Sequence, residues 1–152
     1  MSISSISNGE SGSSVRTKLN SVIDIVNSGI TTGTTYSFGI TLDGQGTVIT
    51  TGVTGTVIVP FNGVITGWDI FEISQTAITS SIVIDAWKAD YGSYPPTVAN
   101  TIFGTKPNLS GGIKNRATGL SIWVNEKDIF RFNVDSVTSA KLVQLIFYIT
   151  RL

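Results

Sequence analysis

Carboxylates are the main candidates for acid–base chemistry in this chain of 152 residues, because it contains no His and no Cys. A glycosidase needs two carboxylates that face each other across a cleft. Asp69 and Glu72 have opposite parity on a predicted strand, so they should point to opposite faces of a sheet. Asp85 lies in the middle of another predicted strand, and we expect a structural role there, bonding a neighbouring loop or Lys88. No carboxylate pair therefore predicts hydrolysis.

Other kinds of site are missing for related reasons. Without His or Cys the chain cannot form a Ser–His pair, a Cys nucleophile or a zinc finger. The Gly44-Gln45-Gly46 turn lacks the third glycine and the following helix of a dinucleotide site. No closely spaced series of Asp residues resembles a calcium loop. We therefore predict no enzyme activity, no metal and no cofactor.

The charge balance argues against two classes of partner. Ten Lys and Arg residues oppose ten Asp and Glu residues, and charged residues make up 13% of the chain. Average domains carry about 25%. A net charge of zero disfavours electrostatic binding to nucleic acid or to a membrane surface. The first residues do not resemble a signal peptide, and no apolar stretch reaches the roughly 18 residues of a membrane helix.

Aromatic residues are the remaining candidates for binding. A long irregular connection between residues 88 and 115 carries Tyr91 and Tyr94, and Trp87 precedes it. Loops at the end of a rigid scaffold often carry function. We take Trp87, Tyr91 and Tyr94 as candidate ligand or receptor contacts, and expect the two tyrosines to be exposed. The alternative is that such aromatics fill the core and close its ends.

The N-terminal segment, residues 1–30, differs from the rest of the chain. Its apolar residues Val15, Leu19, Val22 and Val26 have the spacing of one helical stripe. We predict a helix of about twelve residues, capped by Ser13 or Ser14 and ending at Asn27-Ser28-Gly29. This stripe packs either on its own domain, or on copies of itself or a partner.

From residue 31 to residue 152 the hydrophobic pattern has a period of two. It predicts an all-β domain, an antiparallel β-sandwich of jelly-roll type, preceded by one short N-terminal α-helix. We expect Asn62-Gly63 to join two strands in a hairpin. The last strand is apolar on both faces, which indicates a central position or a subunit contact through Leu142, Ile146 and Tyr148. The eight expected strands are residues 34–42, 47–51, 55–61, 64–71, 80–87, 118–124, 129–134 and 141–151.

Several segments resemble the C-terminal β-domains of virion proteins from tailed bacteriophages, a family that includes tail fibres and head fibres. The resemblance covers roughly residues 47–151. A shorter and less specific similarity to helical motifs of phage tail proteins lies at residues 9–20, GESGSSVRTKLN. The segments that carry the main resemblance are VIDAWKADYGSYPPTVAN at 83–100, KPNLS at 106–110, FNVDS at 132–136, VPF at 59–61 and GW at 67–68.

The resemblance implies a non-enzymatic structural protein of the virion. It implies a homotrimer with a β-sandwich tip, mounted on other virion proteins through its N-terminal segment, and host contact through a surface glycan is one further expectation. Such a protein would assemble in the host cytoplasm and be released by lysis. A capsid decoration or cement protein and a free carbohydrate-binding module remain the alternatives.

Overall fold

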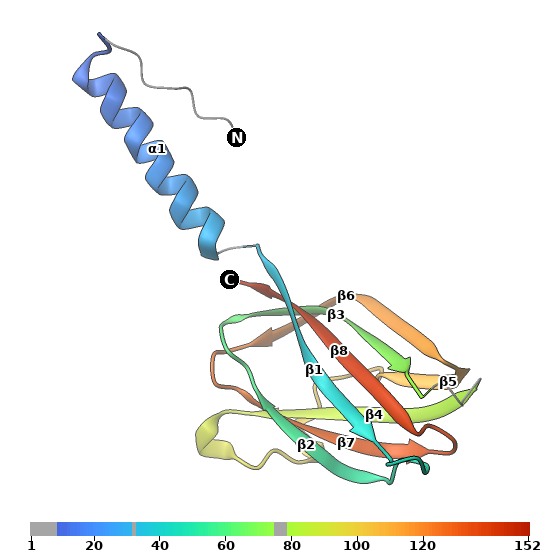
Figure 1. The fold of residues 1–152 in the computed structure, drawn as a ribbon. Helices are drawn as coiled ribbons and strands as arrows, with labels where there is room; N and C mark the ends of the chain where they lie inside the picture. The colour runs from blue at the N-terminus through green and yellow to red at the C-terminus, as the bar shows by residue number, and fades with distance from the viewer. Residues whose placement is uncertain (1–8, 32, 75–78) are drawn as a thin grey trace.

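The computed structural model describes residues 9–31, 33–74 and 79–152. In this part of the chain one helix precedes eight strands, which form two four-stranded antiparallel sheets packed against each other (Figure 1). The helix is α1 (Gly12–Thr31). The strands are β1 (Thr35–Asp43), β2 (Gly52–Ile58), β3 (Gly63–Glu72), β4 (Ser80–Ala89), β5 (Asn108–Gly112), β6 (Lys114–Val124), β7 (Ile129–Val137) and β8 (Leu142–Arg151).

The strand order confirms the predicted sandwich of jelly-roll type. One sheet runs β1-β8-β3-β6 and the other β2-β7-β4-β5. Only β4 and β5 follow each other in the chain and also pair, so most connections cross from one sheet to the other. β8 lies between β1 and β3, the central position that its two apolar faces indicate. The core between the sheets holds alternate side chains, including Phe130, Phe132 and Phe147.

The expected hairpin at Asn62-Gly63 is wrong. β2 pairs with β7, whereas β3 pairs with β6 and β8, so the two strands belong to different sheets. The glycine has another reason to be there. A Cβ on Gly63 would lie 2.6 Å from the carbonyl oxygen of Thr150, so the close approach of β8 requires glycine.

Two strand assignments also need correction. Residues 47–51 lie in the connection between β1 and β2, where the Ile49 N–H donates to the carbonyl of Ala140 (2.9 Å). β5 lies within the connection that we expected to be irregular. Its sequence, NLSGG, has no β-branched residue and two glycines, so it lacks strand propensity. Pairing with β4 makes it a strand.

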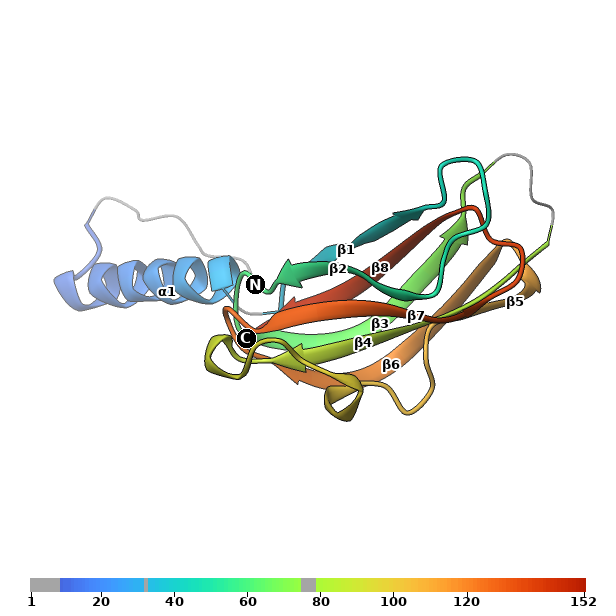
Figure 2. The ribbon, with the colours of Figure 1, turned by 90° about the horizontal axis from the view of Figure 1, so that it is seen from below.

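The helix is longer than predicted, with 20 residues, and it does not end at Asn27-Ser28-Gly29. Ser11, rather than Ser13 or Ser14, accepts a hydrogen bond from the first turn, from the Ser14 N–H (3.3 Å). α1 extends away from the sandwich, as Figures 1 and 2 show. β1 follows after a short link, in which the Gly33 N–H donates to the Arg151 carbonyl (3.1 Å). The division into residues 1–30 and 31–152 stays a prediction.

The sandwich has two distinct ends. At the helix-proximal end, the β2–β3 and β6–β7 turns and the C-terminus meet the start of β1 (Figure 2). There the Leu152 N–H donates to Asn62 (3.2 Å) and the Lys127 N–H to Val59 (2.8 Å). At the helix-distal end, the Gly44 N–H donates to the Lys141 carbonyl (2.8 Å). β4 ends at the helix-proximal end, because Ala89 pairs with Ile129 at the start of β7.

Candidate functional site

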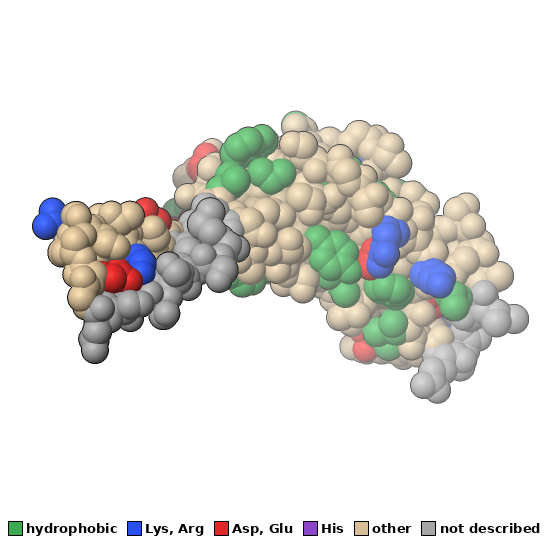
Figure 3. Space-filling view, turned by 90° about the horizontal axis from the view of Figure 1, so that it is seen from above, with side chains coloured by type: hydrophobic (Ala, Val, Ile, Leu, Met, Phe, Trp, Pro, Cys, Tyr) green, Lys and Arg blue, Asp and Glu red, His purple; other side chains and the backbone are tan. Residues whose placement is uncertain are grey.

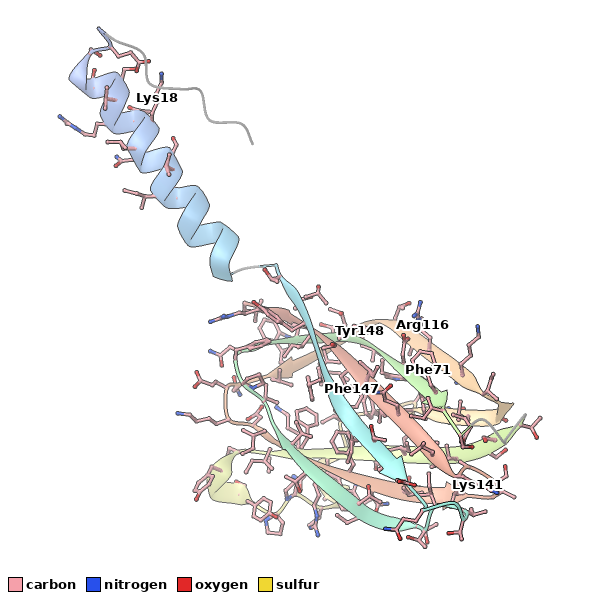
Figure 4. The ribbon with its side chains drawn as sticks, in the orientation of Figure 1. Lys18, Phe71, Arg116, Lys141, Phe147 and Tyr148 are labelled. Atoms are coloured by element: carbon pink, nitrogen blue, oxygen red, sulfur yellow. The ribbon has the colours of Figure 1, made fainter. Side chains whose placement is uncertain are left out.

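A charged cluster lies on the outer face of the β1-β8-β3-β6 sheet. Asp69 of β3 stands opposite Arg116 of β6, and its side chain is buried. Arg116 donates from Nε to Oδ1 (2.5 Å) and from one terminal nitrogen to Oδ2 (2.6 Å). The Tyr148 hydroxyl, from β8, also donates to Oδ2 (2.7 Å). Three strands therefore contribute one side chain each, and Figure 4 labels Arg116 and Tyr148 among them.

A β-bulge decides that Asp69 faces outward. Ile65, Trp68 and Ile70 all belong to the core, so the spacing from Ile65 to Trp68 breaks the period of two. The register shifts between Ile65 and Gly67, in the pairing with both β6 and β8. An extra residue in one strand changes the face to which the following side chains point. Without the bulge, Asp69 would enter the core with Ile65.

The cluster stabilises the ionised form of the aspartate. Hydrogen bonds from Arg116 lower the pKa of Asp69, burial acts in the opposite direction, and the Tyr148 hydroxyl adds a smaller lowering effect. The same contact raises the pKa of Tyr148, because loss of its proton would place a second negative charge beside Asp69. Arg116 and Asp69 thus form a fixed, bidentate ion pair.

A pocket of about 410 Å³ opens beside this ion pair, toward the helix-distal end. Figure 3 shows two positively charged side chains near hydrophobic ones on the half of the sandwich away from α1. Lys114 is exposed, and within the described residues no ion pair involves it. Phe71 is half-buried. The lining residues are Asp69, Phe71, Lys114, Asn115 and Arg116.

The aromatic candidates separate into two groups. Tyr91 is 83% exposed and Tyr94 53% exposed, as expected. With Thr56, Ile58 and Ile129 they line a shallow depression of about 440 Å³. This depression lies at the helix-proximal end, where β2 and β4 end.

Trp87 is not part of the exposed surface. It is 9% exposed, and its indole N–H donates to Asp85 (2.9 Å). The expectation of a contact surface therefore does not extend to Trp87, because its polar edge is occupied and its ring is covered. It belongs instead to the polar network that surrounds Asp85.

Asp85 fastens the long β4–β5 connection to the sheet. Its carboxylate accepts hydrogen bonds from the hydroxyl of Thr101 (2.6 Å) and the N–H of Ala86 (2.8 Å), and it pairs with Lys106 (2.9 Å). Burial raises the pKa of Asp85, but the hydrogen bonds from Thr101, Lys106 and Trp87 outweigh it and the pKa is lowered. Lys88, which we considered as a partner, instead pairs with Asp128 (2.9 Å).

Glu72 faces the opposite way from Asp69, as the parity predicts. It accepts hydrogen bonds from the Ser80 hydroxyl (2.9 Å) and from the N–H groups of Lys141 (3.2 Å) and Leu142 (3.1 Å). Burial raises the pKa of Glu72, yet hydrogen bonds from Ser74, Ser80 and Leu142 lower it overall. Glu72 therefore holds two helix-distal loops together and does not form an acid–base pair with Asp69.

The predicted interface residues lie on two separate surfaces. Leu19 is 50% exposed and Val22 39%, while Val15 is half-buried. The side chain of Val26 lies outside the described residues. Leu142, Ile146 and Tyr148 lie half-buried on the outer face of the β1-β8-β3-β6 sheet, and Tyr148 is already bonded to Asp69.

The described residues contain neither a membrane-spanning helix nor a metal-binding group, and no known protein matched the chain in three comparisons. Among the described residues, no helix is long and apolar enough to cross a bilayer, and no group of three or more acidic, His or Cys side chains is arranged to hold a metal ion. Comparison with known proteins found no matching family model, no matching curated protein and no matching solved structure.

Proposed function

We propose that this chain is a non-enzymatic structural protein of a tailed-bacteriophage particle, a short fibre or appendage. In this proposal α1 associates with α1 of two other copies and attaches the trimer to other virion proteins. The β-sandwich then forms the tip, which faces away from the particle. The sequence resemblance given above supports this class of protein.

The observation that carries the proposal is the exposed apolar stripe of α1. Leu19, Val22 and Ile23 are 39–54% exposed on a helix that extends away from a sandwich with its own complete core. An isolated helix gains little stability from its sequence alone, and most helices depend on packing of an apolar face. Packing against two further copies would bury this stripe around a common axis.

Light scattering of the full chain tests the oligomer. We expect a mass near three times 16.1 kDa at micromolar concentration. The double variant Leu19→Asp/Val22→Asp should reduce it to one chain, while the β-sheet circular dichroism stays unchanged. The matched control is Thr17→Asp/Asn20→Asp, which adds the same charge on the other side of the helix and should stay trimeric. A monomeric wild type, or loss of the sheet signal in the first variant, contradicts the proposal.

The position on the particle is a separate question. Electron microscopy of the particle locates the protein either on the tail, as a fibre or appendage, or on capsomers, as a decoration or cement protein. We expect density on the tail. Density on the capsid would retain the structural role and the trimer, but replace the appendage with a cement protein.

Exposure of Tyr91 and Tyr94 favours a second candidate, a carbohydrate-binding module. Aromatic rings exposed beside Ile58 offer an apolar surface to a sugar. Their place at the helix-proximal end supports this candidate less, since a mounted α1 would turn them toward the particle. Tyr91→Ala/Tyr94→Ala should leave binding on a glycan array and adsorption to cells unchanged; a loss of both would favour the binding module.

A further inference from the structure

Arg116 offers a set of donors that the fold does not use. A guanidinium has five N–H donors, and Asp69 takes one on Nε and one on a terminal nitrogen. Asp69 leaves the other three N–H groups, including both of the other terminal nitrogen, and the Tyr148 hydroxyl also lies near the guanidinium. The edge formed by the two terminal nitrogens can therefore receive a second planar anion, and the Arg116 side chain is 65% exposed.

The aspartate holds this edge in one orientation. Asp69 is itself fixed by the Tyr148 hydroxyl from the neighbouring strand, so the guanidinium cannot turn without breaking two hydrogen bonds. Fixing a binding group in advance reduces the entropy lost on binding. A fixed guanidinium edge on an open sheet face is what recognition of a carboxylate requires.

The pocket also supplies a charge and an apolar wall. Asp69 compensates the charge of Arg116, which leaves Lys114 as the uncompensated positive charge of the lining. The site therefore fits a ligand with a single negative charge. Phe71 lines the same pocket, and the volume of about 410 Å³ lies within the range of small-molecule sites.

We propose that this pocket binds a saccharide unit that carries a carboxylate. The carboxylate lies on the free edge of Arg116 and near Lys114, and an apolar C–H face of the sugar ring packs against Phe71. The pocket lies toward the helix-distal end of the tip, so it remains accessible when α1 is attached. The binding site itself goes beyond the proposed function; only a role in host contact would rest on it.

The residues of this face favour a soluble ligand over a second copy of the chain. Interface cores are depleted in Lys, Asp and Glu, although Arg is enriched there. Here the exposed Lys114, which forms no ion pair within the described residues, lines the pocket, and Leu142 and Ile146 on the same outer sheet face are half-buried. A carboxylate carries the single charge that Lys114 can compensate, whereas a phosphate carries up to two.

Calorimetric titration of the full chain tests the site. The probes are trigalacturonic acid and its methyl ester, which has the same sugar chain with each carboxylate converted to an uncharged ester. We expect the acid to bind and the ester to bind at least about tenfold more weakly, since bonds between charged groups are lost. Absence of binding by the acid, equal binding of the two, or competition by inorganic phosphate at the same concentration would overturn the proposal.

Two variants connect the binding to this pocket. Lys114→Gln should weaken binding about threefold, whereas the matched control Lys127→Gln, in the helix-proximal β6–β7 turn, should not. Arg116→Lys keeps the charge but loses the fork, and should weaken binding about tenfold. Equal affinities of Lys114→Gln and Lys127→Gln would overturn the proposal. So would a changed oligomeric mass in Lys114→Gln, because a neighbouring subunit would then cover this face. The mass of the wild type tests the trimer independently.

Discussion

Asp69 and Asp85 invite comparison because they occupy equivalent places in the two sheets. Each lies in the second half of a ten-residue strand, β3 or β4, between two core residues, and each faces outward. Both side chains are almost completely buried, and the pKa of each is lowered by hydrogen bonds. A carboxylate on the outer face of a sheet is normally hydrated, so something must cover each of them.

What covers each aspartate differs, and so does the consequence. Thr101 and Lys106 of the β4–β5 connection cover Asp85, and they use its hydrogen-bonding capacity to fix that connection. Among the described residues, the side chains that donate hydrogen bonds to Asp69 are Arg116 and Tyr148, each from a neighbouring strand. The first network ends within the protein, whereas the second presents donors to solvent. A buried aspartate therefore fixes a connection on one sheet, at Asp85, and prepares a binding surface on the other, at Asp69.

The largest expected effect is on the closed network. Asp85→Asn removes the charge that Lys106 faces, and it leaves the donors of Trp87 and Thr101 with a poorer acceptor. Weakening several buried hydrogen bonds to one charged group costs about 3 kcal/mol. Urea denaturation should show this loss, and Asp24→Asn on the exposed face of α1 should show none. If both variants unfold at the wild-type urea concentration, Asp85 does not stabilise the connection.

The stability of the fold should also depend on pH, through the buried carboxylates of both networks and Glu72. Asp69, Glu72 and Asp85 have pKa values that are lower in the folded than in the unfolded protein. Groups of this kind stabilise the fold above their unfolded pKa, and this contribution is lost as the pH falls through the folded pKa. The free energy of unfolding should therefore fall below about pH 4. Asp85→Asn should flatten this fall, and a curve parallel to that of the wild type would contradict the assignment.

A smaller loss of stability is expected for the open network. Asp69→Asn should cost about 1.5 kcal/mol, since the Arg116 that loses its partner can be hydrated in place. Urea denaturation measures this loss. A cost equal to that of Asp85→Asn would remove the distinction between the networks.

Two lysines provide the smallest and most specific test. Lys106 bridges Asp85 (2.9 Å) and Asp135 (2.6 Å). Lys106→Gln should lower the free energy of unfolding by about 1 kcal/mol, because Asp85 keeps its hydrogen bonds from Thr101, Trp87 and Ala86. Lys114→Gln should change it by less than about 0.5 kcal/mol. The affinity for trigalacturonic acid should fall more in Lys114→Gln than in Lys106→Gln. If Lys114→Gln is the more destabilising of the two, Lys114 has a structural role instead.

Alternation of apolar residues was sufficient to predict the sandwich, and parity was sufficient to separate Asp69 from Glu72. Prediction from the sequence pattern failed where tertiary contacts override the local preference of a segment. Asn62-Gly63 reads as a hairpin turn, but Gly63 is required by the carbonyl of Thr150 in a strand 87 positions later. β5 has little strand propensity and forms because β4 offers an edge. The helix passed its expected end at Asn27-Ser28-Gly29, since weak helix formers do not stop a helix by themselves.

The candidate pocket was beyond prediction for a related reason. Its members lie on two strands and are 47 positions apart in the sequence at their widest, with Tyr148 from a third strand. The signal that could have found it is the break in period between Ile65 and Trp68, which marks a bulge in β3. A bulge often redirects a side chain toward a functional surface.

The amino-acid sequence by itself determined the kinds of residue that were present: few charges, no His or Cys, and strands that alternate between apolar and polar. These properties act locally or through composition, so they can be recognised without neighbours. Only the tertiary structure decided that the bonds of Asp85 stay within the protein, whereas the Arg116 that binds Asp69 keeps one edge exposed to solvent. That outcome depends on strand order and on one extra residue in β3, because pairing across a sheet brings together residues that are distant in the chain.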